Sequence, residues 1–300
     1  MRRWSFTKGH GTENDFVVLL DREAVWDLGP DEVRRICDRR AGVGADGVLR
    51  AVAARSVAEW DGDPDVWFMD YRNADGSVAE MCGNGLRVFV RFLVEEGLAY
   101  GPEVTVATRA GTRRAELLPD ARIRTSMGPV RLVDPAGGAD PVRVRTADGT
   151  TAAATPADVG NPHAVALLDD AADLDALDLH RAPVVEPAGR FPDGVNVEFV
   201  RVLGPGHVAM RVFERGSGET RSCGTGTVAA AAAAVAARAD GDRPAAVRVD
   251  VPGGTLQVEL GPDEAHLTGP AVVVARGEMY LFDEGRTDGT RTDGVGEDGP

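Results

Sequence analysis

The sequence has few cysteines, no long apolar run and a shortage of positive charge. Its three cysteines are an odd number and lie far apart in 300 residues, so they do not make the disulfide framework of a small secreted domain. A reducing cytoplasm is therefore the location we expect. No apolar stretch approaches the ~18 residues of a membrane span. The first residues lead directly into a polar segment and lack the apolar region of a signal peptide.

The charge balance excludes several kinds of partner. Asp and Glu total 48 against 33 Lys and Arg, which gives a formal net charge of −15. A nucleic-acid binder needs a positive field, and so does a protein that docks on anionic lipid. The five histidines and three cysteines are scattered without close ligand pairs, so we expect no metal site. A small acidic ligand remains compatible, because one local arginine can outweigh distant surface charge.

The pattern of apolar residues predicts an α+β protein with about two domains. A hydrophobic content of 43% and a charged content of 27% suit ordinary buried cores. Helices are predicted at residues 30–37 and 86–96 and in the alanine-rich run 228–237. Strands are predicted at 4–8, 16–20, 66–71, 195–200, 208–213, 247–260 and 271–282, with short β patterns between 103 and 150. Residues 284–300 are almost free of apolar side chains and are predicted to be a disordered tail.

One motif occurs twice. Cys-Gly-x-Gly begins at Cys82 and again at Cys223, 141 residues later, and each copy precedes a predicted buried helix. The chain is therefore predicted to consist of two similar halves, each with a hydrophobic helix surrounded by strands. Cys37, on the face of the helix at 30–37, is instead interpreted as a core thiol.

A cysteine at a helix N-terminus lies among unpaired backbone N–H groups and the positive end of the helix dipole. This predicts a thiol pKa below its usual value of about 8.5, and the glycines let a carboxylate approach the backbone. Two such entrances facing each other would hold one carboxylate between them, with a thiol on either side of the adjacent carbon. That geometry suits inversion of an amino-acid α-carbon by proton removal on one face and proton delivery on the other.

The same motifs allow other interpretations. A single Cys-Gly-x-Gly is usually only a turn with a buried cysteine. Residues 42–47 match the dinucleotide pattern G-x-G-x-x-G, but a helix precedes them and a strand follows, the reverse of what that motif needs. A cysteine hydrolase using Cys223 and His163 would need one thiol only. A protein that merely binds an amino acid would not exchange its α-hydrogen.

The motifs together resemble the diaminopimelate epimerase family. The similar segments, in family order, are KGHGTENDF at 8–16, GVGADG at 42–47, RNADGS at 72–77, MCGNG at 81–85, GNPH at 160–163, GVN at 194–196, ERGSGET at 214–220 and CGTG at 223–226. The resemblance covers residues 4 to about 282. It implies an enzyme that interconverts LL- and meso-2,6-diaminopimelate in lysine and peptidoglycan precursor synthesis, without a cofactor.

The resemblance also implies an organisation and a set of site residues. It implies two pseudo-symmetric domains, 1–128 plus 269–283 and 129–268, in a homodimer. Cys82 and Cys223 are implied as the acid/base thiols, with His163 and Glu214 assisting. The implied donors to the reacting carboxylate are Gly83, Asn84, Gly224 and Thr225. The residues implied to recognise the distal end of the substrate are Asn14, Asn73, Asn161, Asn196 and Arg215. Asn and Arg suit that task because they fix a carboxylate and an amine by several hydrogen bonds.

Two positions depart from the family pattern. Glu13 stands where glycine is common, so a slightly different first loop is expected. Thr227 stands where alanine is common and completes Cys-Gly-Thr-Gly-Thr, which is also the second motif of proline racemases. Those relatives usually have histidine at the position of Asn84 and lack the distal Asn and Arg set, which keeps diaminopimelate ahead of another amino acid such as proline.

Overall fold

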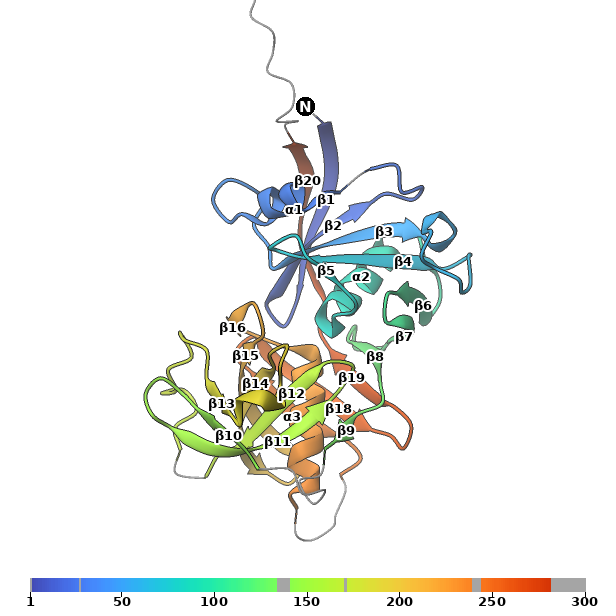
Figure 1. Ribbon diagram of the computed structural model, residues 1–300. Coiled ribbons are helices and arrows are strands. Elements are labelled where there is room, and N and C mark those ends of the chain that lie inside the picture. Colours follow the sequence, from blue (N-terminus) through green and yellow to red (C-terminus); the bar gives the residue numbers. More distant parts are fainter. Residues whose placement is uncertain (1, 27, 134–140, 170–171, 239–243, 282–300) are drawn as a thin grey trace, which may run out of the picture.

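The computed structural model describes residues 2–26, 28–133, 141–169, 172–238 and 244–281. It is strand-rich, and its two long helices, α2 (Gly83–Glu95) and α3 (Gly224–Ala236), lie in separate lobes, each partly enclosed by strands (Figure 1). The predicted α+β class with two similar halves is confirmed. The predicted tail, 284–300, lies outside the described residues.

The first lobe contains the beginning of the chain and its last described strand. Its elements are β1 (Arg2–Gly11), β2 (Asn14–Leu20), α1 (Pro30–Cys37), β3 (Gly47–Ala53), η1 (Ala54–Ser56), β4 (Trp67–Asn73), β5 (Val78–Ala79), α2, β6 (Glu103–Thr108), β7 (Gly111–Leu117), β8 (Ile123–Gly128) and β20 (Val272–Leu281).

The second lobe contains the middle of the chain. Its elements are β9 (Arg131–Leu132), β10 (Val142–Arg145), β11 (Thr151–Asp158), β12 (Pro162–Leu167), β13 (Val184–Glu186), η3 (Ala188–Arg190), β14 (Asn196–Gly204), β15 (His207–Glu214), β16 (Gly218–Thr220), α3, β17 (Val247–Val251), β18 (Gly254–Leu260) and β19 (Ala265–Gly269).

Strand pairing repeats between the lobes. In the first, β2 pairs parallel with β3, β3 antiparallel with β4, and β4 parallel with β6. In the second, β12 pairs parallel with β14, β14 antiparallel with β15, and β15 parallel with β17. The helix follows the third member of each series after a short hairpin strand, β5 or β16, and precedes the fourth. Equivalent loops of the two lobes therefore lie at equivalent strand ends.

Each long helix is buried in its own apolar cluster. On α2 the buried side chains are large, including Leu86, Phe89 and Leu93, and they pack against β2, β3 and β4. On α3 they are mostly alanines around Val228, so strands approach this helix closely. Burial of the larger side chains stabilises each lobe by roughly 1.5–3 kcal/mol per residue. Cys37 is buried in a third cluster with α1, which confirms that it is a core thiol.

The lobes are joined by one strand pair and two chain crossings. β8 of the first lobe pairs antiparallel with β19 of the second, and the chain then returns to pair β20 with β1. Figure 1 shows β20 running from the junction to the far end of the first lobe. The predicted domain boundaries fall beside these crossings and stay a prediction.

The turn between β1 and β2 reaches the second lobe. Thr12 and Glu13 both have positive φ, 49° and 60°, a region that glycine adopts most easily. This explains why a glycine is expected at position 13. Glu13 forms an ion pair with Arg221 of the second lobe, and the Thr12 hydroxyl is 2.7 Å from the Ser222 hydroxyl.

The structure differs from the local predictions in several places, and it also contains β11 and β12, which were not predicted. Both long helices begin earlier than predicted, at Gly83 and Gly224, because a cysteine caps each glycine-containing first turn. Residues 265–269 form a strand that the pattern missed, since pairing with both β18 and β8 stabilises this short mixed segment. The loop after Glu214 is a hairpin turn into β16. Among the described helices, none has the length and apolarity needed to cross a bilayer.

Candidate active site

Cys82 and Cys223 occupy the same position on the two long helices. Each is the N-cap residue, and each sulfur accepts a hydrogen bond from the third residue along. The Gly85 N–H donates to Cys82 Sγ at 3.3 Å, and the Gly226 N–H donates to Cys223 Sγ at 3.4 Å. An N-cap side chain normally satisfies such an orphan N–H through oxygen. Here the acceptor is a sulfur atom that can also hold or release a proton.

The two helix N-termini meet. A Cβ atom on Gly224 would stand 3.1 Å from Gly83 Cα and 3.4 Å from the backbone nitrogen of Asn84. Only glycine permits this approach. The structure thus brings the residues predicted around the reacting carboxylate to one place. The N-terminal N–H groups and positive dipole ends of two helices converge there, an arrangement that is typical of anion-binding sites.

Amide groups surround Cys82. Its thiol donates to Asn14 Oδ1 at 3.7 Å, and the same oxygen accepts from Asn84 Nδ2 at 3.3 Å. Asn14 Nδ2 in turn donates to Asp46 at 2.8 Å. Asn14, predicted to bind the distal end of the substrate, therefore contacts the first thiol directly. Cys82 is only partly buried.

Carboxylates surround Cys223, which is buried. Its sulfur lies 3.5 Å from the Thr225 hydroxyl, and it also hydrogen-bonds Glu214, whose carboxylate accepts from the Thr220 hydroxyl. Burial raises the pKa of Glu214, which favours its protonated form as a hydrogen-bond donor.

A buried pair of side chains from β12 and β14 lies against the first turn of α3. His163 Nδ1 is 2.7 Å from Glu198 Oε1, and both side chains are fully buried. The other ring nitrogen, Nε2, is 2.9 Å from Asn161 Oδ1. A Cβ on Gly226 would stand 2.5 Å from Glu198 Oε1, so this carboxylate lies against the first turn of α3. Glu198 Oε2 has no hydrogen-bond partner among the described residues.

The thiol pKa values differ from the prediction in their direction. Burial raises the pKa of Cys82 to about 11, although the N–H groups of Gly85 and Asn84 oppose the shift. Burial, followed by the charges of Glu214 and Glu198, raises the pKa of Cys223 well above its ordinary value. The prediction of lowered pKa values was wrong because loss of water disfavours a buried thiolate more than the helix N-terminus favours it.

Comparisons with known proteins identify the family of this chain. The family model described as diaminopimelate epimerase matches residues 6–133 and 155–281. The chain belongs to the diaminopimelate epimerase family. Diaminopimelate epimerase from Streptomyces coelicolor is 51% identical over 287 residues, covering 92% of this chain and 96% of the relative. The enzyme of the same name from Thermobifida fusca is 49% identical, covering 92% and 98%.

Solved structures share the fold at low identity. A phenazine biosynthesis protein of the PhzF family from Bacillus anthracis superposes with a TM-score of 0.65 at 16% identity, covering 94% of this chain and 100% of that one. A hydroxyproline epimerase from Agrobacterium vitis superposes with a TM-score of 0.62 at 17% identity, covering 94% of each chain. These likenesses extend the diaminopimelate epimerase fold to proteins of other activities.

The other predicted site residues of this chain lie at strand ends near the junction of the two lobes. Asn73 closes the β4–β5 hairpin, where its Nδ2 donates to Ser77 Oγ at 3.0 Å. The Arg215 N–H donates to Asn196 Oδ1 at 2.9 Å, and the Arg215 side chain donates to the Asp193 carbonyl at 3.0 Å. Asn196 is also paired in register with His163. None of these side chains has a hydrogen bond to either sulfur among the described residues.

Several residues of the site were missed from the sequence. Tyr71 is buried, and its pKa is raised first by burial and then by the charges of Cys82, Glu214, Asp46 and Cys223. Glu198 and Arg87 each interrupt an otherwise apolar buried element. A charged residue inside an apolar segment can be recognised in the sequence, and it indicates a specific interaction because a buried charge needs a partner. Thr12 and Ser222 carried no such signal, since their contacts join distant parts of the chain.

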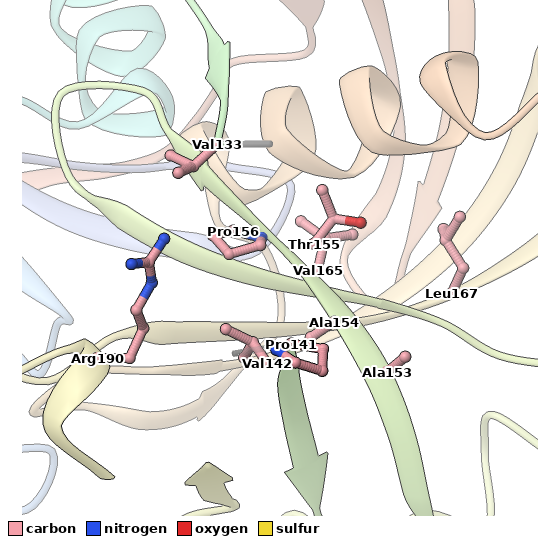
Figure 2. A pocket seen from close by; sticks show the side chains of 10 residues that line it. All are labelled: Val133, Pro141, Val142, Ala153, Ala154, Thr155, Pro156, Val165, Leu167 and Arg190. Atoms are coloured by element: carbon pink, nitrogen blue, oxygen red, sulfur yellow. The ribbon is translucent and has the colours of Figure 1, made fainter. Parts of the chain in front are cut away.

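One cavity in the described part of the chain lies away from this site. It has a volume of about 330 Å³ and is lined mostly by apolar side chains of the second lobe, including Val142, Pro156 and Val165, with Arg190 at one side (Figure 2). None of the predicted site residues lines it. Within the described ranges, no cluster of three or more His, Cys, Asp or Glu side chains could hold a metal ion.

Proposed function

We propose that this protein interconverts LL- and meso-2,6-diaminopimelate by proton transfer between two thiols. The observation that carries the proposal is the contact of the two helix N-termini, each capped by a cysteine, at Gly83 and Gly224. Membership of the diaminopimelate epimerase family and curated relatives at 51% and 49% identity support the substrate.

In the proposed mechanism, the α-carboxylate of the substrate lies between the helix ends. The backbone N–H groups of Gly83, Asn84, Gly224 and Thr225 donate to it and stabilise the extra charge of the enolate-like transition state. One cysteine, as thiolate, removes the α-hydrogen, and the other, as thiol, delivers a proton to the opposite face. The product leaves with inverted configuration, and the two sulfurs have exchanged protonation states.

Glu214 and His163 assist on the Cys223 side. Glu214 hydrogen-bonds the Cys223 thiol, and burial keeps its own pKa raised. A raised pKa favours the protonated form of Glu214, which can donate a hydrogen bond to a Cys223 thiolate. His163 is held by Glu198 and directs its other nitrogen toward Asn161.

Recognition of the unreacted end is proposed for a ring of amide and guanidinium groups. They are Asn73, Asn161, Asn196 and Arg215, with Asn14 at the boundary with the first thiol. A carboxylate gripped by Arg215 and an amine accepted by asparagine oxygens would fix one configuration at the distal carbon. The exposed side chain of Arg215 is free to reorient toward a bound carboxylate.

A homodimer and a cytoplasmic location complete the proposal. β20 pairs only with β1 among the described strands, and its free edge carries the exposed side chains Val274 and Tyr280. An apolar unpaired edge of this kind favours association with a second copy. The three cysteines are free, which suits a reducing compartment.

The test is hydrogen exchange. The full-length protein is incubated in heavy water with LL-diaminopimelate, and the α-hydrogen and stereochemistry are followed by NMR. We expect exchange of the α-hydrogen at one carbon together with formation of the meso isomer. The α-hydrogens of proline and lysine should not exchange. Exchange of proline in place of diaminopimelate would assign the site to another amino acid. Binding without exchange would reject catalysis.

A further inference from the structure

Arg87 is a fully buried cation on α2, one turn inside the helix entrance that Cys82 caps. All of its hydrogen bonds go to neutral acceptors. Nη2 donates to Asn84 Oδ1 at 2.7 Å and to the Thr12 hydroxyl at 3.3 Å. Nε donates to the Pro270 carbonyl at 3.1 Å, and Nη1 donates to the Gly83 carbonyl at 3.3 Å. No Asp or Glu of the described residues forms an ion pair with it.

The surrounding backbone is shaped to hold the guanidinium. A Cβ on Gly11 would stand 3.0 Å from Arg87 Nη2, and a Cβ on Gly269 would stand 3.1 Å from Nε. These two glycines come from the β1–β2 turn and from the end of β19. Arg87 therefore sits where the two lobes join, in a space that only glycine at both positions leaves open.

Burial of a cation without an anion is costly, and proteins normally supply a carboxylate. Burial lowers the pKa of Arg87 to about 10, and the charge of Cys82 is the single influence that opposes this shift. The amides of Asn14 and Asn84 lie beside the Cys82 thiol, and the charged or titratable groups that act on it are Glu214 on β15, Tyr71 on β4 and Arg87. Of these, Arg87 alone carries positive charge.

We infer that the positive charge of Arg87 stabilises the Cys82 thiolate, and that Arg87 also positions the first turn of α2, which Cys82 caps. The inference rests on the proposed two-thiol function and deepens it. When Cys82 loses its proton, the buried guanidinium gains the anion that it lacks. Arg87 also fixes Asn84, which donates to the Ser222 carbonyl at 3.0 Å and so orients the residue before Cys223.

The second lobe provides a natural comparison. The residue five positions after Cys82 is Arg87, and the residue five positions after Cys223 is Val228, which is fully buried among alanines. Cys223 faces Glu214 and Glu198 instead. The counter-charge therefore serves one helix N-terminus only, and Cys82 is the thiol that ionises more readily.

The first experiment measures alkylation of Cys82 by iodoacetamide as a function of pH. Cys223→Ala protein is used so that the reaction reports the first thiol, and the modified residue is located by mass spectrometry. Arg87→Met should raise the pKa of Cys82 by about one unit and slow alkylation at pH 8 about tenfold. Arg87→Lys keeps the charge and should stay within about threefold. Unchanged rates in Arg87→Met, or equal defects in both variants of matched melting temperature, would overturn the inference.

The second experiment leaves Arg87 in place. Asp and Asn differ in charge but hardly in shape, and both are good N-cap residues. At pH 7.5 we expect Cys82→Asp to melt about 3 °C above Cys82→Asn, because the aspartate supplies the missing anion. Cys223→Asp should melt below Cys223→Asn, because it faces two carboxylates. The same order at both positions would contradict the inference. Neither experiment uses diaminopimelate, so failure here and failure of the proposed function are separate results.

Discussion

The backbone has a similar geometry at the N-termini of α2 and α3, but the side chains around the two cysteines differ. Each has a cysteine N-cap, a glycine that touches the other helix and an N–H that donates to sulfur. Around Cys82, however, the neighbours are amides, and a buried guanidinium opposes the negative charge of Glu214. Around Cys223 they are a hydroxyl and carboxylates. Backbone symmetry therefore places the thiols, and the side chains decide which one holds a proton.

The difference matters because the proposed two-thiol mechanism needs one thiolate and one thiol at the start of each turnover. If both entrances carried the same charges, neither state would be preferred. A positive charge at one entrance and negative charges at the other select a single resting arrangement. The following predictions test that division, beginning with the largest effect.

Loss of either thiol should abolish epimerisation. Cys82→Ala and Cys223→Ala each remove one half of the proton transfer, so we expect turnover to fall by about 10³-fold or more. Cys37→Ala is the matched control, since this thiol is buried in a separate core. Turnover is measured by NMR with LL-diaminopimelate. Substantial activity in Cys82→Ala would favour a hydrolase-like scheme with one thiol.

Oxidation should join the two entrances. Because the helix N-termini touch at Gly83 and Gly224, mild oxidation of substrate-free protein is expected to link Cys82 to Cys223 and to inactivate it. Peptide mapping identifies the link, and reductant should restore activity. Cys37→Ala protein should behave identically. Inactivation that reductant does not reverse would argue against a simple disulfide.

The buried pair on the Cys223 side should matter for rate more than for binding. Glu198→Gln keeps the shape but removes the charge beside His163, so we expect kcat to fall about tenfold with little change in KM. Steady-state kinetics supply both values. Glu259→Gln, which breaks a surface ion pair with Arg124, is the control and should change neither. A KM effect alone would make Glu198 part of substrate recognition.

The thiols should titrate in a fixed order. Burial raises the pKa of Cys82 to about 11, so its thiolate fraction should increase about tenfold per pH unit between pH 7 and 10. Cys223 faces two carboxylates and should react only at higher pH. Alkylation of the single-cysteine variants across this range provides the comparison. Earlier reaction of Cys223 would reverse the assignment of the resting thiolate.

The smallest effect is expected from the end of the chain. Residues 284–300 are polar and glycine-rich, so their deletion should leave activity and melting temperature unchanged within error. Calorimetry and the NMR assay measure the two quantities. A change in either would mean that the segment contacts one of the lobes.

Much of this architecture was accessible from the sequence because its signals are local or repeated. The duplicated Cys-Gly-x-Gly located both entrances, and apolar periodicity located the helices behind them. The β19 strand was not accessible, because its stability comes from pairing with β8, more than 130 residues earlier in sequence. The direction of the thiol pKa shifts was also out of reach. It depends on how completely packing removes water, and no short motif reports that.

The junction of β8 with β19 has a consequence for how such a site can arise. Because both halves belong to one polypeptide, equivalent positions such as Arg87 and Val228 can carry different residues. Two identical half-length subunits around a twofold axis would present the same groups to both faces of the substrate. Covalent fusion of the halves removes that constraint. The two thiols can then have different surroundings on the two faces of a stereocentre, which is itself unsymmetrical.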